Sequence, residues 1–180
     1  MTELEIFNVI RQIVITVTGV PECILADQDA EAPIGEYATV KITPGAEQRG
    51  HANMVRSAVT GQQQQNVDVR SQLIASCSVN FYRGNASDRA QRLRQANKRP
   101  DISKLLYDND TGWHRSGPIN NLTTLQSSAK ESRSQITVYL SYEYSSPVVI
   151  NSVEQVDLIT SNESNTVVFT TNVNSSEPVN

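Results

Sequence analysis

Histidine and cysteine are the residue types best suited to metal binding and acid–base chemistry, and the chain contains two of each. His51 lies in a polar stretch and His114 follows Trp113, and neither has a Cys, Asp or Glu at metal-ligand spacing. Cys23 and Cys77 lack the Cys-x-x-Cys spacing of metal and redox sites, so we expect reduced thiols, with Cys77 buried in a strand. These residues predict neither a metal site nor a catalytic one.

The acidic residues also lack the arrangement that catalysis requires. Asp27, Asp29 and Glu31 crowd one segment, whereas paired-carboxylate catalysis brings two acids together from separate elements. Residues 108–112 read Asp-Asn-Asp-Thr-Gly, like the start of a calcium loop, but the terminal glutamate of that motif is missing, so a turn is favoured. No phosphate-binding glycine loop, nucleophile elbow or dinucleotide fingerprint occurs. We therefore expect a non-enzymatic protein without a cofactor.

One cluster of basic residues could bind an anionic partner. It comprises Arg83, Arg89, Arg92, Arg94, Lys98 and Arg99, opposed nearby by Asp88. A solvated face or a set of intersubunit salt bridges is one interpretation, and contact of Arg89, Arg92, Arg94 and Lys98 with DNA or an acidic partner is the other. The net charge of -4 weighs against a dedicated nucleic-acid binder. A nucleic-acid-binding module that uses the helix over residues 87–99 is the alternative function.

Three helices are predicted around these residues. Thr2 and Glu5 form a capping box, and apolar residues then recur at helical spacing until Gly19. A basic helix follows Asn85 or Ser87 and runs to about residue 99. Ala86, Ala90, Leu93 and Asn97 are expected to lie along one narrow stripe of this helix. A third helix covers residues 100–107, and we expect a long ordered loop over residues 108–122.

Alternation of apolar and polar residues predicts several half-buried strands. They cover residues 23–26, 36–43, 67–82 and 134–144, and residues 148–159 predict one more strand or a short helix. The resulting fold class is α+β, with an antiparallel or mixed sheet that helices flank on one face.

The strand over residues 67–82 is about twice the usual length. Residues 51–60 alternate loosely, and Gly61 and four glutamines separate the two runs. This pattern predicts a long, projecting β-hairpin arm over about residues 51–69. A two-stranded ribbon is marginally stable alone, so the arm should lie against another subunit or a partner. The candidate intersubunit contacts are Gln62, Gln63, Gln64, Gln65 and Val67.

The domain organisation predicted from composition is one α+β domain over residues 1–160 and a Ser/Asn-rich tail over residues 161–180. The tail is either disordered or adds a strand to an adjacent subunit. No apolar run reaches the length of about 18 residues that spans a bilayer, and the N-terminus carries acids where a secretory signal carries bases. We expect a cytoplasmic protein without membrane contact.

The order of the elements and several short motifs resemble the neck terminator and tail terminator proteins of long-tailed bacteriophages over residues 4–159. The motifs are Thr18-Gly19-Val20-Pro21, residues 32–40, Phe81-Tyr82-Arg83-Gly84, the basic helix and Gly117-Pro118-Ile119. The resemblance implies a structural virion protein that forms a ring, commonly a hexamer, at the head-to-tail junction. Its implied partners are further copies of itself, the tail tube and possibly sheath subunits, and the head-completion or portal adaptor ring. Genomic DNA would pass through the lumen with transient, non-specific contact, and assembly would take place in the bacterial cytoplasm.

Overall fold

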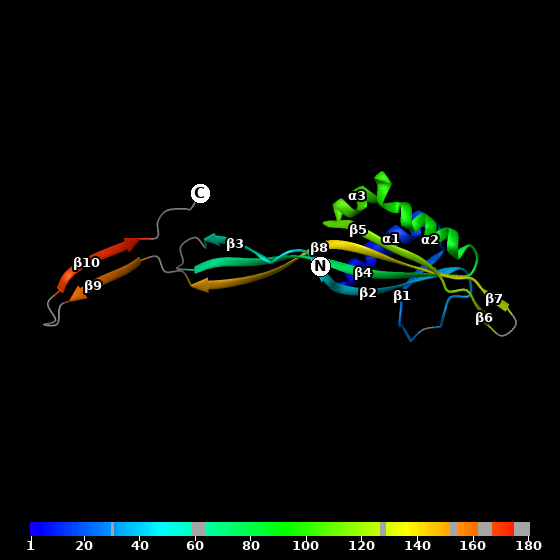
Figure 1. Ribbon diagram of the computed structural model, residues 1–180, viewed down its shortest axis with the longest axis horizontal. Helices are drawn as coiled ribbons and strands as arrows, with labels where there is room; N and C mark the ends of the chain where they lie inside the picture. Colours follow the sequence, from blue (N-terminus) through cyan, green and yellow to red (C-terminus); the bar gives the residue numbers. More distant parts are fainter. Residues whose placement is uncertain (30, 59–63, 127–128, 152–154, 162–166, 175–180) are drawn as a thin grey trace. The chain divides into compact units, whose positions relative to one another are not determined.

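The computed structural model describes residues 1–29, 31–58, 64–126, 129–151, 155–161 and 167–174 (Figure 1). Contacts divide the chain into two compact units. Unit 1 contains Met1–Ala52 and Ser71–Tyr144, and unit 2 contains Asn53–Arg70 and Ser145–Asn180. Two long strands, β4 (Gln64–Tyr82) and β8 (Arg133–Asn151), contribute residues to both units. The expected domain boundary at residue 160 stays a prediction.

Helix α1 (Glu3–Thr18) begins and ends as its sequence predicts. The Thr2 amide donates to Glu5 Oε2 at 2.7 Å, and the Glu5 amide donates to Thr2 Oγ1 at 3.3 Å, which completes the capping box. Gly19 adopts a left-handed conformation with φ of 66° and ends the helix.

The basic segment forms α2 (Ala86–Gln95) and a short 3₁₀ turn, η1 (Ala96–Lys98), followed by α3 (Pro100–Asp108). Ala86, Ala90 and Leu93 are buried as expected, but Asn97 is exposed and Ala96 takes the buried position. The reason is the tighter turn of the 3₁₀ helix, which repeats after three residues instead of nearly four.

The six-stranded sheet has the order β1-β2-β4-β8-β5, in which β5 covers Thr111–Asn121, and β3 (Asn53–Ala58) pairs with β4. Strand β1 (Glu22–Leu25) is parallel to β2 (Tyr37–Gln48), whereas β2 is antiparallel to β4. Helix α1 packs against β1 and β2, while α2 and α3 pack against β5. The predicted class, an α+β fold with a mixed sheet flanked by helices, is therefore confirmed.

The expected long loop after α3 is wrong, because this segment forms strand β5 (Thr111–Asn121). It pairs antiparallel with β8 and is the outermost strand of the sheet. Its register shifts twice, between Trp113 and Arg115 and between Ser116 and Ile119. Glycine, proline and asparagine are tolerated there because an edge strand has one unpaired side and accommodates bulges. Strand β2 likewise continues past Pro44 through a register shift between Thr43 and Glu47.

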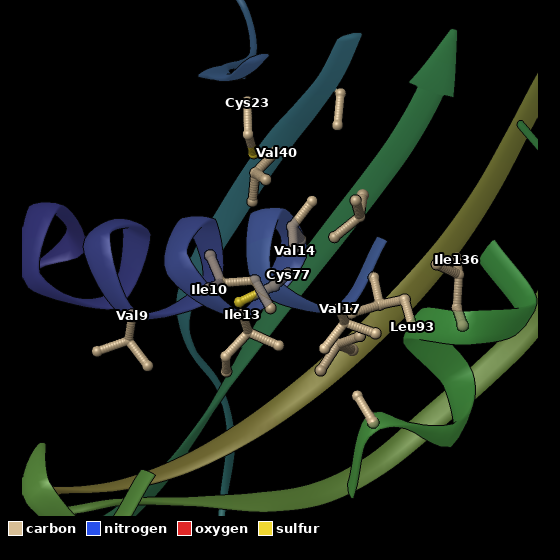
Figure 2. Close-up of a cluster of buried hydrophobic side chains, with 14 of the residues drawn as sticks. Val9, Ile10, Ile13, Val14, Val17, Cys23, Val40, Cys77, Leu93 and Ile136 are labelled. Carbon is tan, nitrogen blue, oxygen red and sulfur yellow. The ribbon is translucent and has the colours of Figure 1, made fainter. Parts of the chain in front are cut away.

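The core of unit 1 lies between α1 and the sheet, with α2 closing one end (Figure 2). Residues contributed by α1 are Val9, Ile10, Ile13, Val14 and Val17, which pack with Cys23, Val40, Cys77, Ile136 and Leu93. Cys23 and Cys77 are free thiols, 1% and 0% exposed. Burial raises the pKa of both thiols to about 12. The predicted burial of Cys77 is confirmed.

The remaining strands form smaller ladders. Strand β3 (Asn53–Ala58) pairs antiparallel with residues 65–70 of β4. Strand β6 (Thr124–Gln126) pairs antiparallel with β7 (Ala129–Glu131). Strand β9 (Gln155–Ser161) pairs antiparallel with β10 (Val167–Asn174), so this part of the Ser/Asn-rich tail pairs within its own chain. Residues 148–159, expected as one element, are divided between β8 and β9.

Candidate interaction surfaces

Most members of the basic cluster have carboxylate partners within the folded chain. Arg89 forms an ion pair with Glu36, and its side chain is 13% exposed. The other pairs join Arg92 to Asp88 at 2.9 Å, Arg99 to Asp101 at 2.6 Å and Arg83 to Glu131 at 3.3 Å. Glu36 and Glu131 are distant from the cluster in sequence. Local sequence therefore indicates only Asp88 as an acidic residue opposing these bases. These internal pairs remove much of the positive charge available to an anionic partner.

Arg94 and Lys98 differ from the rest of the cluster. Both are exposed, and within the part of the chain that the structure describes neither forms an ion pair. They line a shallow hollow on the outer face of α2 and η1, together with Gln91, Gln95 and Asn97. The hollow therefore combines two positive charges with amide groups and the methylene stems of long side chains.

Arg83 fixes the loop between β1 and β2. Its Nη1 donates to the carbonyl oxygens of Pro33 at 2.7 Å, of Ile34, and of Gly35 at 3.0 Å. The Arg83 amide also donates to the Ser132 carbonyl at 2.7 Å. Arg83 itself has a left-handed backbone with φ of 64°, which is uncommon for a residue other than glycine. One side chain thus holds three consecutive carbonyls of a surface loop.

The exposed position of the Ile34 side chain results from this arrangement and was not predicted from the sequence. Its side chain is 97% exposed, although its backbone is held by Arg83. Asp29 and Glu31 are exposed in the same loop, and neither forms an ion pair with any described residue. An apolar residue between Pro33 and Gly35 was the available signal, since these neighbours favour a turn.

Two stacked tyrosines support the base of the loop. The Tyr37 and Tyr82 rings lie 4.6 Å apart and are inclined by 4°. The Arg83 guanidinium lies 5.6 Å from the Tyr37 ring, and that of Arg133 lies 4.9 Å from the Tyr82 ring. The Arg83 contact connects the loop to the tyrosine stack, whereas the Arg133 contact joins neighbouring strands of the sheet.

The groups considered for catalysis or metal binding do not converge. Asp27 pairs with Lys41 at 2.6 Å, and both histidines are exposed. The segment that begins like a calcium loop is the turn between α3 and β5, in which Asp110 has φ of 50°. Among the described residues no group of three or more His, Cys, Asp or Glu side chains could hold a metal ion.

Unit 2 contains a ribbon of three neighbouring strand segments (Figure 1). In this ribbon β3 lies beside the first part of β4, which lies beside the last part of β8. Ser145 Oγ donates to Asp68 Oδ1 at 2.6 Å, which links β8 to β4. Several large apolar side chains of this ribbon are exposed: Met54 58%, Val55 42%, Val148 50%, Val149 59% and Ile150 41%. Exposed apolar side chains gathered on one ribbon are a candidate interaction surface.

The sequence matches the family described as phage neck terminator protein over residues 4–165. The chain belongs to the phage neck terminator protein family. A search of curated proteins finds no match. Membership makes this neck terminator protein a structural component of the phage virion, which assembles in the neck with tail and head components.

The predicted contact residues of this neck terminator protein occupy different environments. Val67 is 6% exposed and is buried by its own chain, whereas Gln64 and Gln65 are half-buried. Gln62 and Gln63 lie outside the described residues. Their role as intersubunit contacts stays a prediction, and the exposed valines of β8 are additional candidates. In the described part of the chain no helix is long and apolar enough to cross a membrane.

Proposed function

We propose that this neck terminator protein forms a closed ring of six copies at the head-to-tail junction. The ring joins the tail tube, and the sheath where one is present, to the head-completion or portal adaptor ring. Genomic DNA passes through its lumen. The observation that carries the proposal is the exposed apolar ribbon of unit 2, in a chain that belongs to a neck terminator family.

The ribbon supports assembly because its apolar side chains have no cover within the described chain. Val148, Val149 and Ile150 follow one another in β8, so their side chains alternate between the two faces of the ribbon. Burial of apolar surface contributes roughly 25 cal/mol per Å². A neighbouring subunit that covers these residues would therefore stabilise both the ribbon and the ring.

Weak contact with DNA is consistent with the charges. The chain carries a net charge of -4, and Arg83, Arg89, Arg92 and Arg99 are paired with carboxylates. Tight DNA binding depends on cations that neutralise phosphates and release counterions. A lumen built from this chain would hold DNA weakly and let it pass.

The test replaces Val148, Val149 and Ile150 together with threonine. Threonine is β-branched and keeps the strand propensity, but it reduces the apolar surface. Rings should no longer be seen by electron microscopy, while the circular dichroism spectrum should show that the subunit keeps its secondary structure. A matched control places threonine at the exposed polar positions Asn53, Ser57 and Asn151 of the same ribbon. Rings that survive the apolar substitutions would refute the role of the ribbon.

The alternative of a nucleic-acid-binding module rests on Arg94 and Lys98, which form no ion pair with described residues. It predicts duplex binding at low salt that falls steeply as salt rises. Changing both residues to alanine should then abolish binding, whereas Arg92→Ala, at a paired position, should have a smaller effect. A wild-type protein that does not bind duplex DNA at low salt removes this alternative.

A further inference from the structure

We propose that the loop between β1 and β2 docks into the α2 hollow of a second copy of the chain. Ile34 is the apolar anchor of this contact, and Asp29 and Glu31 face Arg94 and Lys98. The inference rests on the proposed ring, and it names two surfaces of unit 1 through which neighbouring subunits meet.

The donor surface is organised before any partner arrives. Three carbonyls around Ile34 accept hydrogen bonds from Arg83, and Arg83 is itself paired with Glu131 at 3.3 Å. A loop already held in its bound conformation loses little conformational entropy on docking. A fixed, 97% exposed isoleucine is therefore suited to fill a recess on another protein.

The acceptor surface matches the donor in charge. Arg94 and Lys98 have no ion pair with described residues, and neither have Asp29 and Glu31. The other cations of α2 and η1 lie beside carboxylates of their own chain. Among the described residues of these two surfaces, the charges without an ion pair are two acids on the loop and two bases at the hollow, so a second copy could supply the opposite charge to each surface.

The positions of the two surfaces favour contact between different copies. The loop follows β1, the outermost strand at one edge of the sheet, whereas α2 packs against β5, the outermost strand at the other edge. In Figure 1 the loop and α2 lie on opposite sides of the strands of unit 1. A contact between two unlike surfaces repeats from copy to copy and closes into a ring when its rotation permits.

The first test measures assembly of the full chain by analytical ultracentrifugation with Ile34→Asp. Since the Ile34 side chain is 97% exposed and the substitution leaves its carbonyl in place, the subunit should stay folded, and its self-association should weaken at least about 10-fold. Tyr107→Asp is the matched control, because Tyr107 is 82% exposed in the same unit and lies outside both surfaces. Equal association of the two variants would overturn the proposal.

The second test exchanges charges across the contact. Glu31→Lys and Lys98→Glu should each weaken self-association, and the double variant should recover part of the loss, because the pair is restored with reversed sign. If the wild-type chain forms rings and neither charge reversal weakens self-association, this contact is overturned and the ring proposal is left intact. A wild-type chain that never associates would overturn both. If Lys98→Glu reduces binding of duplex DNA but leaves self-association unchanged, the hollow is assigned to DNA contact instead of subunit contact.

Discussion

Arg89 and Arg94 lie on the same helix and carry the same charge, yet they have different surroundings. Arg89 is largely buried against Glu36, which is distant in sequence, while Arg94 is exposed at the hollow. Local sequence does not distinguish these cations, because it does not predict which of them will pair with carboxylates that are distant in sequence. Candidate binding residues in this cluster could therefore be named from sequence, but not ranked.

Gly84→Ala tests the Glu36–Arg89 pair. A Cβ at Gly84 would lie 1.5 Å from Glu36 Oε1, and Gly84 has φ of 50°. The Glu36 carboxylate must move away from the largely buried Arg89, and the left-handed backbone adds strain. We expect a loss of about 2–4 kcal/mol in the free energy of unfolding, measured by urea denaturation. Gly35→Ala, where nothing lies within 4 Å, should cost far less, and equal losses would contradict the explanation.

The buried thiols predict a loss of stability in alkali. Burial raises the pKa of Cys23 and Cys77 from 9.0 to about 12, so the folded state favours the neutral thiols. Their contribution to stability is complete below pH 9, the pKa of the unfolded thiol, and is lost as the pH rises from 9 through 12. The free energy of unfolding should fall by about 1.4 kcal/mol per thiol for each pH unit in that window. A variant with alanine at both cysteines should show a shallower fall in urea denaturation, and an unchanged slope would contradict this account.

Whole elements could be predicted where one physical pattern dominates. Period-two alternation predicted β4 and β8, and the capping box and Gly19 predicted the ends of α1. The pattern failed for β5, since an edge strand with two register shifts loses its alternation. It also ended the strand at residue 144 and assigned residues 148–159 to a separate strand or short helix, whereas β8 continues through the non-alternating run Val148-Val149-Ile150. Sequence periodicity reports a buried face, so segments without one stay invisible to it.

Val67→Ala distinguishes an internal role of the ribbon from an intersubunit role. Val67 is 6% exposed in the single chain, so its truncation should destabilise the ribbon even in an isolated subunit. Hydrogen exchange of the amides of β3 and of residues 65–70 should accelerate by roughly 10-fold, for a loss of about 1–2 kcal/mol. Val55→Ala, at a valine that is 42% exposed in the partner strand, is the control. Exchange that accelerates equally in both variants would argue against the burial of Val67 within its own chain.

At the scale of the whole molecule, three features support a ring subunit. The chain belongs to a neck terminator family, its ribbon exposes apolar side chains, and its loop and hollow carry complementary charges. The resemblance seen in the sequence covered residues 4–159, and the family match covers residues 4–165. The family could be recognised from sequence because it rests on element order and motifs. The proposed docking of the loop could not be predicted from sequence, because it depends on Arg83 holding carbonyls that are distant in sequence.

Native mass spectrometry of the purified wild-type chain tests the central claim most directly. The ring proposal predicts a single closed species of six copies of the 19.9 kDa chain, without a ladder of larger assemblies. A monomer at every concentration, or an open-ended series of oligomers, would contradict it.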